Sequence, residues 1–435
     1  MTHFLDKVEA AITRTEALPA ATRRAIFTEF SPERIRADAA QLAARHNAGE
    51  DMPLFGALIS VKDLFDEAGQ VTTAASRLLT DNPPAATDAV AVARLRKAGA
   101  LMFGRTTMSE FAYSGVGLNP HYGTPSSVLV PGVMPGGSTS GGAVTVAMGL
   151  VDAAIGTDTG GSLRIPAVAN GLWGMKPSQG LIDPTGVHPL APTYDTPGPI
   201  ARDPVMLRQV LAVMADRPLQ ADVPQTLTLA VPEGAFTDAL TPEVNALFQA
   251  EKTRIRALGH GLEPLDLGWL VAAIGLNRII VSVEAHRIYV SDLDRLATIG
   301  DPRVLARIRF AETLTQAQID EAYATRAEIT ARFDAAMAGF DALLAPTLMA
   351  LPPTIAEIES NFDRLNAAML RNPSLVNLAD GCAVALPTPG LNPPWSMTML
   401  VGRNGQDAAM LGAAERIAGV SSALAGRHDL TGPAG

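Results

Sequence analysis

Two segments rich in glycine and serine contain the residue types that could do chemistry. Residues 135–142 read Pro-Gly-Gly-Ser-Thr-Ser-Gly-Gly, and residues 156–166 read Gly-Thr-Asp-Thr-Gly-Gly-Ser-Leu-Arg-Ile-Pro. In the second segment two glycines precede Ser162, which permits a sharp turn where successive N–H groups converge. That is the shape of an oxyanion hole. Ser162 is therefore a candidate nucleophile, and Thr159, Gly160, Gly161 and Ser162 itself are candidate N–H donors.

The first segment could instead bind a phosphate, because a glycine-rich loop before a helix places backbone N–H groups near an anion. The Walker pattern requires Gly-Lys-Ser/Thr, and no such sequence follows residues 135–142. The dinucleotide pattern Gly-x-Gly-x-x-Gly is also absent. The motif test therefore disfavours nucleotide binding.

A serine nucleophile needs a base, and the familiar arrangements fail here. Gly-x-Ser-x-Gly fails at Ser162, because position 164 is arginine. Ser-x-x-Lys fails throughout, because no lysine has a serine three places before it. The number of histidines does not exclude a histidine as the base. Only His260 has glycine on both sides, however, and we interpret it as part of a surface turn. Lysine is the base that remains to be considered.

Lys62 is unusual for this chain, which has 5 lysines against 29 arginines. It ends the apolar, strand-like run Leu58-Ile59-Ser60-Val61, where a solvated charge would be misplaced. Burial can lower the pKa of a lysine until the amine is neutral and accepts a proton, which arginine cannot do. The alternative is an ordinary lysine at a strand end that pairs with Asp63. The local sequence leaves both interpretations open.

Composition limits the class of protein. The chain has 435 residues, 47% of them hydrophobic and 18% charged, which is enough apolar surface for a folded core of one or two domains. The formal net charge of −10 opposes binding to phosphate backbones or anionic lipid. We therefore expect no direct contact with nucleic acid or membrane.

The sequence also bears on compartment and metals. Cys382 is the single cysteine, it has apolar neighbours, and we expect it in the core rather than as a reactive thiol. No Cys/His spacing resembles a zinc site, so no metal is expected. The first residues lack a signal-peptide pattern, and the most apolar segments, 144–155 and 269–283, contain Asp152 and Arg278. These features predict a cytoplasmic protein without a membrane span.

The elements that would position these residues alternate between helix and strand. Residues 1–50 predict two or three helices, one of them starting at Ser31-Pro32. Strands are predicted at 58–61, 100–103, 342–345 and 397–400, and helices at 88–98, 143–150 and 408–417. This alternation predicts an α/β fold. No linker marks a boundary, so we expect a single domain over 1–435.

Lys62, Ser138 and Ser162 together resemble the catalytic Ser-cisSer-Lys triad of the amidase signature family. The interval of 24 residues between the two serines is similar to that of the family, and further motifs resemble it from Pro53 to Asp203. These motifs are Ser60-Val61-Lys62-Asp63, Thr72-Thr73-Ala74-Ala75-Ser76, Gly104-Arg105-Thr106-Thr107-Met108-Ser109-Glu110-Phe111, both Gly/Ser segments, Gly174-Met175-Lys176-Pro177-Ser178 and Asp195-Thr196-Pro197-Gly198-Pro199. Arg105 and Thr107 stand where the family more often has Lys and Asn.

The resemblance implies roles for these residues. Ser162 would be the nucleophile, Ser138 would follow a cis peptide bond from Gly137 and relay a proton, and Lys62 would be the base. The implied fold is a single large α/β/α sandwich around a mixed sheet, with an N-terminal helical segment at 1–50, a catalytic core at 53–203 and a completing half with the substrate pocket at 204–435. No cofactor is implied.

Other residues are predicted to support the site. Asp158 and Arg164 flank the nucleophile, and we expect them to pair and brace its turn, because buried charges need partners. Asp63 and Asp195 are expected to be further supports, and Ser140 a helix cap. Candidates for the pocket wall are Tyr113, Ser114, His121 and Tyr194, whereas Trp395, Met397 and Met399 are expected to be core strand residues.

The function implied is hydrolysis of a small carboxamide or ureido-type amide to an acid and ammonia or an amine. Its partner would be the small-molecule substrate, and a homodimer would be in keeping with the family. Two alternatives stay open: a glutaminase subunit of a transfer-RNA-dependent amidotransferase, and a non-catalytic binding protein with the same fold.

Overall fold

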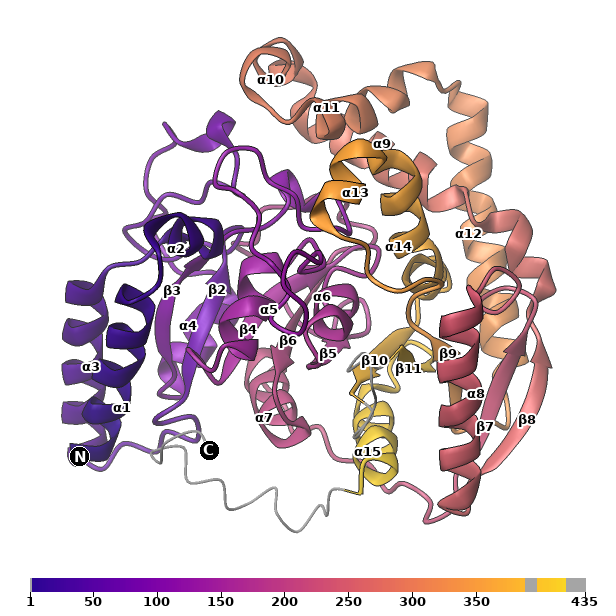
Figure 1. Cartoon of the computed structure of the whole chain (residues 1–435), viewed down its shortest axis with the longest axis horizontal. Coiled ribbons are helices and arrows are strands. Elements are labelled where there is room, and N and C mark those ends of the chain that lie inside the picture. Colours follow the sequence, from indigo (N-terminus) through magenta and orange to yellow (C-terminus); the bar gives the residue numbers. More distant parts are fainter. Residues whose placement is uncertain (1, 388–396, 420–435) are drawn as a thin grey trace.

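The computed structural model describes residues 2–387 and 397–419 (Figure 1). The strands are β1 Phe27–Glu29, β2 Leu58–Lys62, β3 Leu101–Thr106, β4 Ala153–Asp158, β5 Trp173–Lys176, β6 Thr196–Ala201, β7 Thr228–Glu233, β8 Gly261–Asp266, β9 Ala342–Pro346, β10 Cys382–Leu386 and β11 Thr398–Gly402. The α-helices are α1 Thr2–Glu16, α2 Ala20–Ile26, α3 Pro32–Asn47, α4 Val90–Lys97, α5 Ser140–Ala147, α6 Arg164–Ala169, α7 Pro204–Ala215, α8 Pro242–Ala257, α9 Leu276–Tyr289, α10 Leu293–Ile299, α11 Pro302–Arg309, α12 Gln316–Ala336, α13 Ile355–Ser360, α14 Phe362–Leu378 and α15 Asp407–Ile417. Short 3₁₀ helices are η1 Arg77–Leu79, η2 Glu110–Ala112, η3 Gly268–Ala273, η4 Val290–Asp292 and η5 Phe310–Thr313.

All these strands form one mixed sheet in the order β1-β3-β2-β4-β6-β5-β10-β11-β9-β7-β8. The pairs β2–β3, β2–β4, β7–β8 and β7–β9 are parallel, and the others are antiparallel. Strands β2 to β6 come from residues 53–203 and strands β7 to β11 from residues 204–435. The two sets meet where β5 pairs with β10, so the sheet is continuous across the chain.

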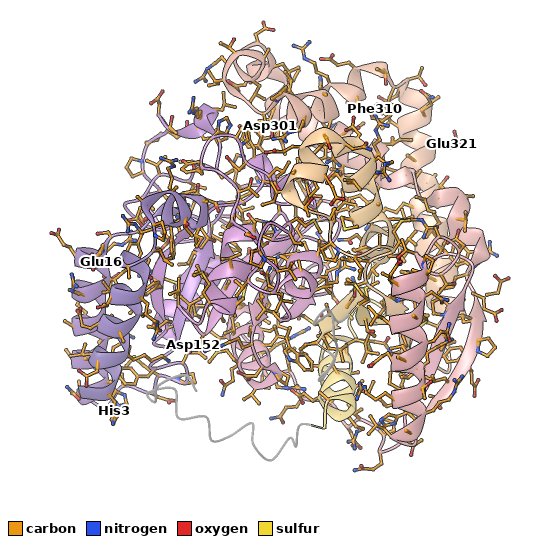
Figure 2. The ribbon with its side chains drawn as sticks, viewed as in Figure 1. His3, Glu16, Asp152, Asp301, Phe310 and Glu321 are labelled. Atoms are coloured by element: carbon orange, nitrogen blue, oxygen red, sulfur yellow. The ribbon has the colours of Figure 1, made fainter. Side chains whose placement is uncertain are left out.

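Helices cover both faces of the sheet, because successive strand residues point to opposite sides. In β2, Leu58 packs into the core beneath α1, α3 and α5, whereas Ile59 packs into the core beneath α4 and α7. Leu343 and Leu344 divide between the two faces of β9 in the same way. Side chains fill the space between the layers, while Glu16 and Glu321 lie at the periphery (Figure 2). The predicted α/β/α sandwich is confirmed.

The N-terminal segment contains three helices, as predicted, together with the edge strand β1, which the sequence analysis did not predict. Ser31 caps α3 by accepting a hydrogen bond from the N–H of Arg34 at 3.3 Å. The strands predicted at 58–61, 100–103 and 342–345 and the helix at 408–417 are confirmed within one to three residues. Met397 lies just before β11, Met399 lies within it, and both are buried. Trp395 lies outside the described residues.

One continuous stretch, Gly268–Ile299, is long and apolar enough by composition to cross a membrane. In the structure it is divided into η3, α9, η4 and α10, and α9 packs against α11 and α12 (Figure 1). Ile280 and Ala285 of α9 are fully buried in the core. Within this stretch, α9 therefore packs as a core helix of the sandwich.

In this fold we expect the free energy of unfolding to depend on side chains buried between the sheet and its helices. Leu344 is 1% exposed, so Leu344→Ala should lower the free energy of unfolding by about 2–5 kcal/mol. Val290→Ala, at a residue 55% exposed, is the control and should have little effect. Urea unfolding followed by circular dichroism measures both, and equal losses in the two variants would contradict the assignment of Leu344 to the core.

Candidate active site

The parallel strands β2 and β4 bring the two Gly/Ser segments and Lys62 together. Lys62 is the last residue of β2, and Asp158 is the last residue of the neighbouring β4. The carboxyl ends of adjacent parallel strands lie at the same edge of a sheet, which is where α/β proteins place their sites. The loop before α5 carries Ser138 to this edge, and the turn between β4 and α6 carries Ser162.

Lys62 is fully buried, and its amine contacts hydroxyl groups. The Nζ atom lies 2.7 Å from Ser138 Oγ, 3.0 Å from Thr157 Oγ1 and 3.4 Å from the carbonyl oxygen of Thr157. Asp63 points the other way and pairs with Arg105, whose Nε lies 2.7 Å from Asp63 Oδ1. The alternative in which Lys62 pairs with Asp63 is therefore wrong, because consecutive residues at a strand end face opposite sides. Asp63 supports its surroundings through Arg105, as a supporting residue was expected to do.

Burial makes the Lys62 amine a possible proton acceptor at neutral pH. Desolvation lowers the pKa of Lys62 from 10.5 to about 7, and the more distant charges of Asp195 and Asp158 oppose part of this shift. A group with this pKa is partly neutral at physiological pH, which is the condition for general base catalysis.

The two serines lie on loops that contact each other. The peptide bond Gly137–Ser138 is cis, as the resemblance implied. The N–H of Thr139 donates a hydrogen bond of 3.4 Å to the carbonyl oxygen of Ser162. Gly161 adopts φ +131°, and a Cβ there would lie 2.6 Å from Pro373 Cβ, so only glycine fits directly before Ser162.

The turn before Ser162 presents N–H groups, although fewer than expected. The N–H of Gly161 donates to Asp158 Oδ1 at 2.8 Å, so it is not free to hold an oxyanion. Within residues 2–387 and 397–419, the N–H groups of Thr159, Gly160 and Ser162 donate to no other group. These three are the donors that the structure leaves open for a developing negative charge.

Asp158 and Arg164 form the ion pair that was predicted to brace the turn. Arg164 Nη2 lies 2.9 Å from Asp158 Oδ1 and Arg164 Nε lies 3.1 Å from Oδ2, with both side chains fully buried. Burial would raise the pKa of Asp158, but Arg164 outweighs it, so that the pKa falls to about 2. Asn377 of α14 contacts both members of the pair. The turn that carries Ser162 is therefore fixed by a charge pair and by a residue of the second half.

Asp195 holds the other end of the turn. Its carboxylate accepts hydrogen bonds from the Thr159 hydroxyl and from the N–H groups of Leu190 and Ala191. Burial raises the pKa of Asp195 to about 6, although these hydrogen bonds and the nearby Lys62 oppose the rise. Asp195 is thus a supporting residue that fixes Thr159.

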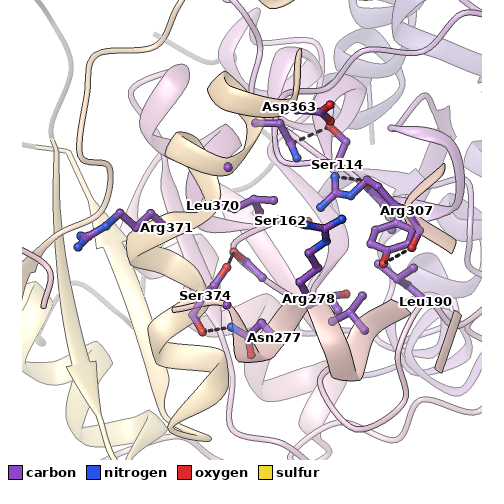
Figure 3. A pocket seen from close by; sticks show the side chains of 18 of the residues that line it. Ser114, Ser162, Leu190, Asn277, Arg278, Arg307, Asp363, Leu370, Arg371 and Ser374 are labelled. Atoms are coloured by element: carbon purple, nitrogen blue, oxygen red, sulfur yellow. Dashed lines mark hydrogen bonds between the residues drawn. The ribbon is translucent and has the colours of Figure 1, made fainter. Parts of the chain in front are cut away.

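A cavity of about 520 Å³ opens beside Ser162 (Figure 3). Its wall includes Thr159, Gly160, Tyr113 and Ser114, the last two as predicted. His121 and Tyr194 do not line it, so their assignment to the wall is wrong. His121 instead bonds to Glu110 at 2.8 Å, and Tyr194 is buried under the guanidinium of Arg326.

Three further predictions can be compared with the structure. Ser140 does not cap α5 with its side chain, because it is the first residue within the helix and Thr139 holds the cap position. His260 follows the exposed turn at Leu258 and Gly259, but it is itself 7% exposed, and its Nδ1 accepts a hydrogen bond from the N–H of Leu227. Cys382 is buried in β10, and burial raises the pKa of its thiol, as expected of a core residue.

The sequence analysis missed Thr157, Asn377 and the cavity residues of the second half. Thr157 directly precedes Asp158 in β4. Because side chains alternate along a strand, its hydroxyl points to the side opposite Asp158, and this could have marked it as a contact of Lys62. Asn377 and Asn366, which accepts hydrogen bonds from Ser114 and from the N–H of Gly115, gave no local signal. Among the described residues, no group of three His, Cys, Asp or Glu side chains could hold a metal ion.

The α/β fold thus places a buried lysine amine against Ser138, on a loop whose neighbouring Thr139 contacts the backbone of Ser162. The family model described as "Amidase" matches residues 6–411. 2-Amino-5-chloromuconic acid deaminase of Comamonas testosteroni is 31% identical over 435 residues, covering 93% of this chain and 91% of the relative. A glutamyl-tRNA(Gln) amidotransferase subunit of Roseiflexus castenholzii is 29% identical, with 89% of this chain and 84% of the relative covered. A solved amidase crystal structure matches with a TM-score of 0.86 and 30% identity over 96% of each chain.

The chain belongs to the amidase signature family. It is an amidohydrolase that acts on carbon–nitrogen amide bonds.

The Asp158–Arg164 pair predicts a large cost when one partner is removed. Arg164→Gln should lower the free energy of unfolding by about 3–5 kcal/mol, because it leaves a buried carboxylate unpaired. Glu9→Gln, which removes the exposed pair with Arg36, is the control and should change little. Thermal unfolding of both variants at pH 7 measures the difference. A stability of Arg164→Gln close to that of the parent would contradict the bracing role.

Proposed function

We propose that this amidase hydrolyses a small carboxamide or ureido-type amide through an acyl-enzyme on Ser162, with Ser138 as proton relay and Lys62 as base. The observation that carries the proposal is the 2.7 Å contact between a buried Lys62 amine and Ser138 Oγ, on a loop that contacts the backbone of Ser162. No carboxylate of the described residues neutralises this amine by direct contact, and its pKa of about 7 favours proton transfer at neutral pH.

In the first step Ser162 Oγ attacks the carbonyl carbon of the amide. The Ser162 proton passes to Ser138, and the Ser138 proton passes to neutral Lys62. The negative charge that develops on the carbonyl oxygen is held by the open N–H groups of the turn, and each such donor is worth about 3–4 kcal/mol in the transition state.

The intermediate then collapses and the C–N bond breaks. Lys62 returns its proton through Ser138 to the leaving nitrogen, which departs as ammonia or an amine. Water enters, loses a proton to the same relay and attacks the acyl-enzyme carbonyl carbon. The acid leaves and Ser162 is restored, so protons and atoms balance without any cofactor.

A second candidate function is the glutaminase subunit of an amidotransferase, because a glutamyl-tRNA(Gln) amidotransferase subunit is among the relatives. A chain that releases ammonia on its own supports the free-standing amidase, whereas glutaminase activity that requires a partner supports the amidotransferase role. The acidic charge of the chain and the single cysteine favour a cytoplasmic enzyme that contacts no nucleic acid directly. A homodimer is the oligomeric state we propose.

Ser162→Ala should abolish turnover while the protein stays folded, because alanine fits the turn but carries no nucleophile. Ammonia release from a panel of glutamine, aliphatic and aryl amides, malonamate-type acids and biuret-type ureides measures this, with circular dichroism as the folding check. Ser140→Ala, which removes a hydroxyl at the first residue of α5 outside the proposed relay, is the matched control. Activity of Ser162→Ala near that of the parent would remove Ser162 as nucleophile.

The pH profile should report the base. Because neutral Lys62 is the active form and its pKa is about 7, kcat/KM should be constant above that pH and fall by roughly tenfold per unit well below it. Asp195 raises the pKa of Lys62 through its charge, so Asp195→Asn should move the acidic limb to lower pH. A profile of the parent that is flat down to about pH 5, with Lys62→Ala still active, would contradict Lys62 as base.

A further inference from the structure

Two arginines reach the cavity beside Ser162 from helices of the second half. Arg278 of α9 lies at the exposed mouth, and Arg307 of α11 lies half-buried further in. Figure 3 shows both side chains directed into the same part of the pocket. Within the described part of the chain, neither arginine forms an ion pair with a carboxylate.

Aromatic rings hold both arginines while leaving much of their hydrogen-bonding capacity unused. The guanidinium carbon of Arg278 lies 3.8 Å from the ring centroid of Phe310, and that of Arg307 lies 4.6 Å from the centroid of Tyr113. Arg307 Nη1 also donates to the carbonyl oxygen of Tyr113 at 2.9 Å. Stacking occupies the face of a guanidinium, so the N–H groups at its edge remain available for a planar anion.

The local charge is positive although the chain is acidic overall. Desolvation lowers the pKa of Arg307, the charges of Tyr113 and Asp363 oppose part of this shift, and the neighbouring charge of Arg278 acts in the same direction as desolvation. A third arginine of the wall, Arg371, is paired with Asp238. Among the described residues, Asp363 is the one carboxylate in the cavity wall, so two guanidinium groups face a single carboxylate that forms an ion pair with neither.

Two neighbouring guanidinium groups repel each other, and this repulsion costs free energy that a bound anion would offset. We propose that Arg278 and Arg307 bind a carboxylate of the substrate, so that the natural substrate is an amide with a free carboxylate beyond its scissile carbonyl. This inference rests on the proposed function, because Ser162 defines where the amide carbon must lie. Arginine suits this task because its planar fork matches the two oxygens of a carboxylate.

The first test compares amides of one shape and different charge. Malonamate, succinamate and glutaramate are each matched with the neutral amide in which an isopropyl group replaces the carboxylate. For the preferred spacer, kcat/KM should be at least about tenfold higher for the anionic amide, which corresponds to one charge-assisted hydrogen bond. Equal or higher values for the neutral amides would overturn the inference and leave the amidase function intact.

Variants then test the two arginines themselves. Arg278→Gln and Arg307→Gln should each reduce the ratio of anionic to neutral kcat/KM by about tenfold, toward a ratio of 1. Arg332→Gln removes an arginine that stacks on Trp269 outside the cavity, and it should leave that ratio unchanged. An unchanged ratio in both pocket variants would overturn the assignment.

A binding measurement separates the inference from the proposed chemistry. Calorimetry with the Ser162→Ala protein should show binding of the same anionic amides and of succinate, weakened at least about tenfold by adding Arg278→Gln or Arg307→Gln. If the parent hydrolyses no amide but this arginine-dependent binding is present, the proposed function fails and the carboxylate site stands. If the folded protein binds none of these anions, the carboxylate site is refuted.

Discussion

A lysine amine buried at the end of β2 without a carboxylate in contact is the constraint on which the site depends. Contact with water or with a carboxylate would keep the Lys62 amine charged. The fold buries the amine and places no carboxylate of the described residues in contact with it. The adjacent Asp63 is committed to Arg105 on the other side of the strand. Hydroxyl groups of Ser138 and Thr157 contact the amine instead, and they serve either protonation state. The chemistry we propose follows from this neutral environment.

The turn that carries Ser162, by contrast, is held by full charges. Asp158 and Arg164 are both buried, and they are tolerable only because they pair and because Asn377 and backbone N–H groups complete their hydrogen bonds. Asn377 belongs to α14, in the half of the chain that also supplies Arg278 and Arg307. The first half of the sheet therefore carries the groups that we propose to react, while the second half braces them and supplies much of the cavity wall. This division allows the substrate preference to change without disturbing the lysine and serines.

The sequence predicted the fold class and pointed to the candidate reacting residues because both leave local signals. Short apolar runs mark β2 and β9, and glycines before Ser162 mark a turn that a Cβ would block. Residues that act through space left none. Asn377 and Arg307 look like ordinary helical residues until the sheet brings their helices to Ser162. His121 and Tyr194 were misplaced because closeness in sequence to the active loops does not give a side chain's direction. Gly161 was predicted to be an oxyanion-hole donor, but its N–H donates to Asp158 Oδ1. The direction of the Asp158 side chain could not be read from the sequence.

The most direct test of this account is the titration of Lys62 itself. Protein labelled with ¹³C at the lysine Cε positions contains only five such residues, and Lys62→Met assigns the signal. Lys176 is a useful comparison, because it is also buried but donates to the carbonyl oxygens of Pro177 and Gly381. The account predicts that the Lys62 signal titrates near pH 7 in the folded protein. A Lys62 signal that stays in its charged position to beyond about pH 9, as an unperturbed lysine would, would contradict it.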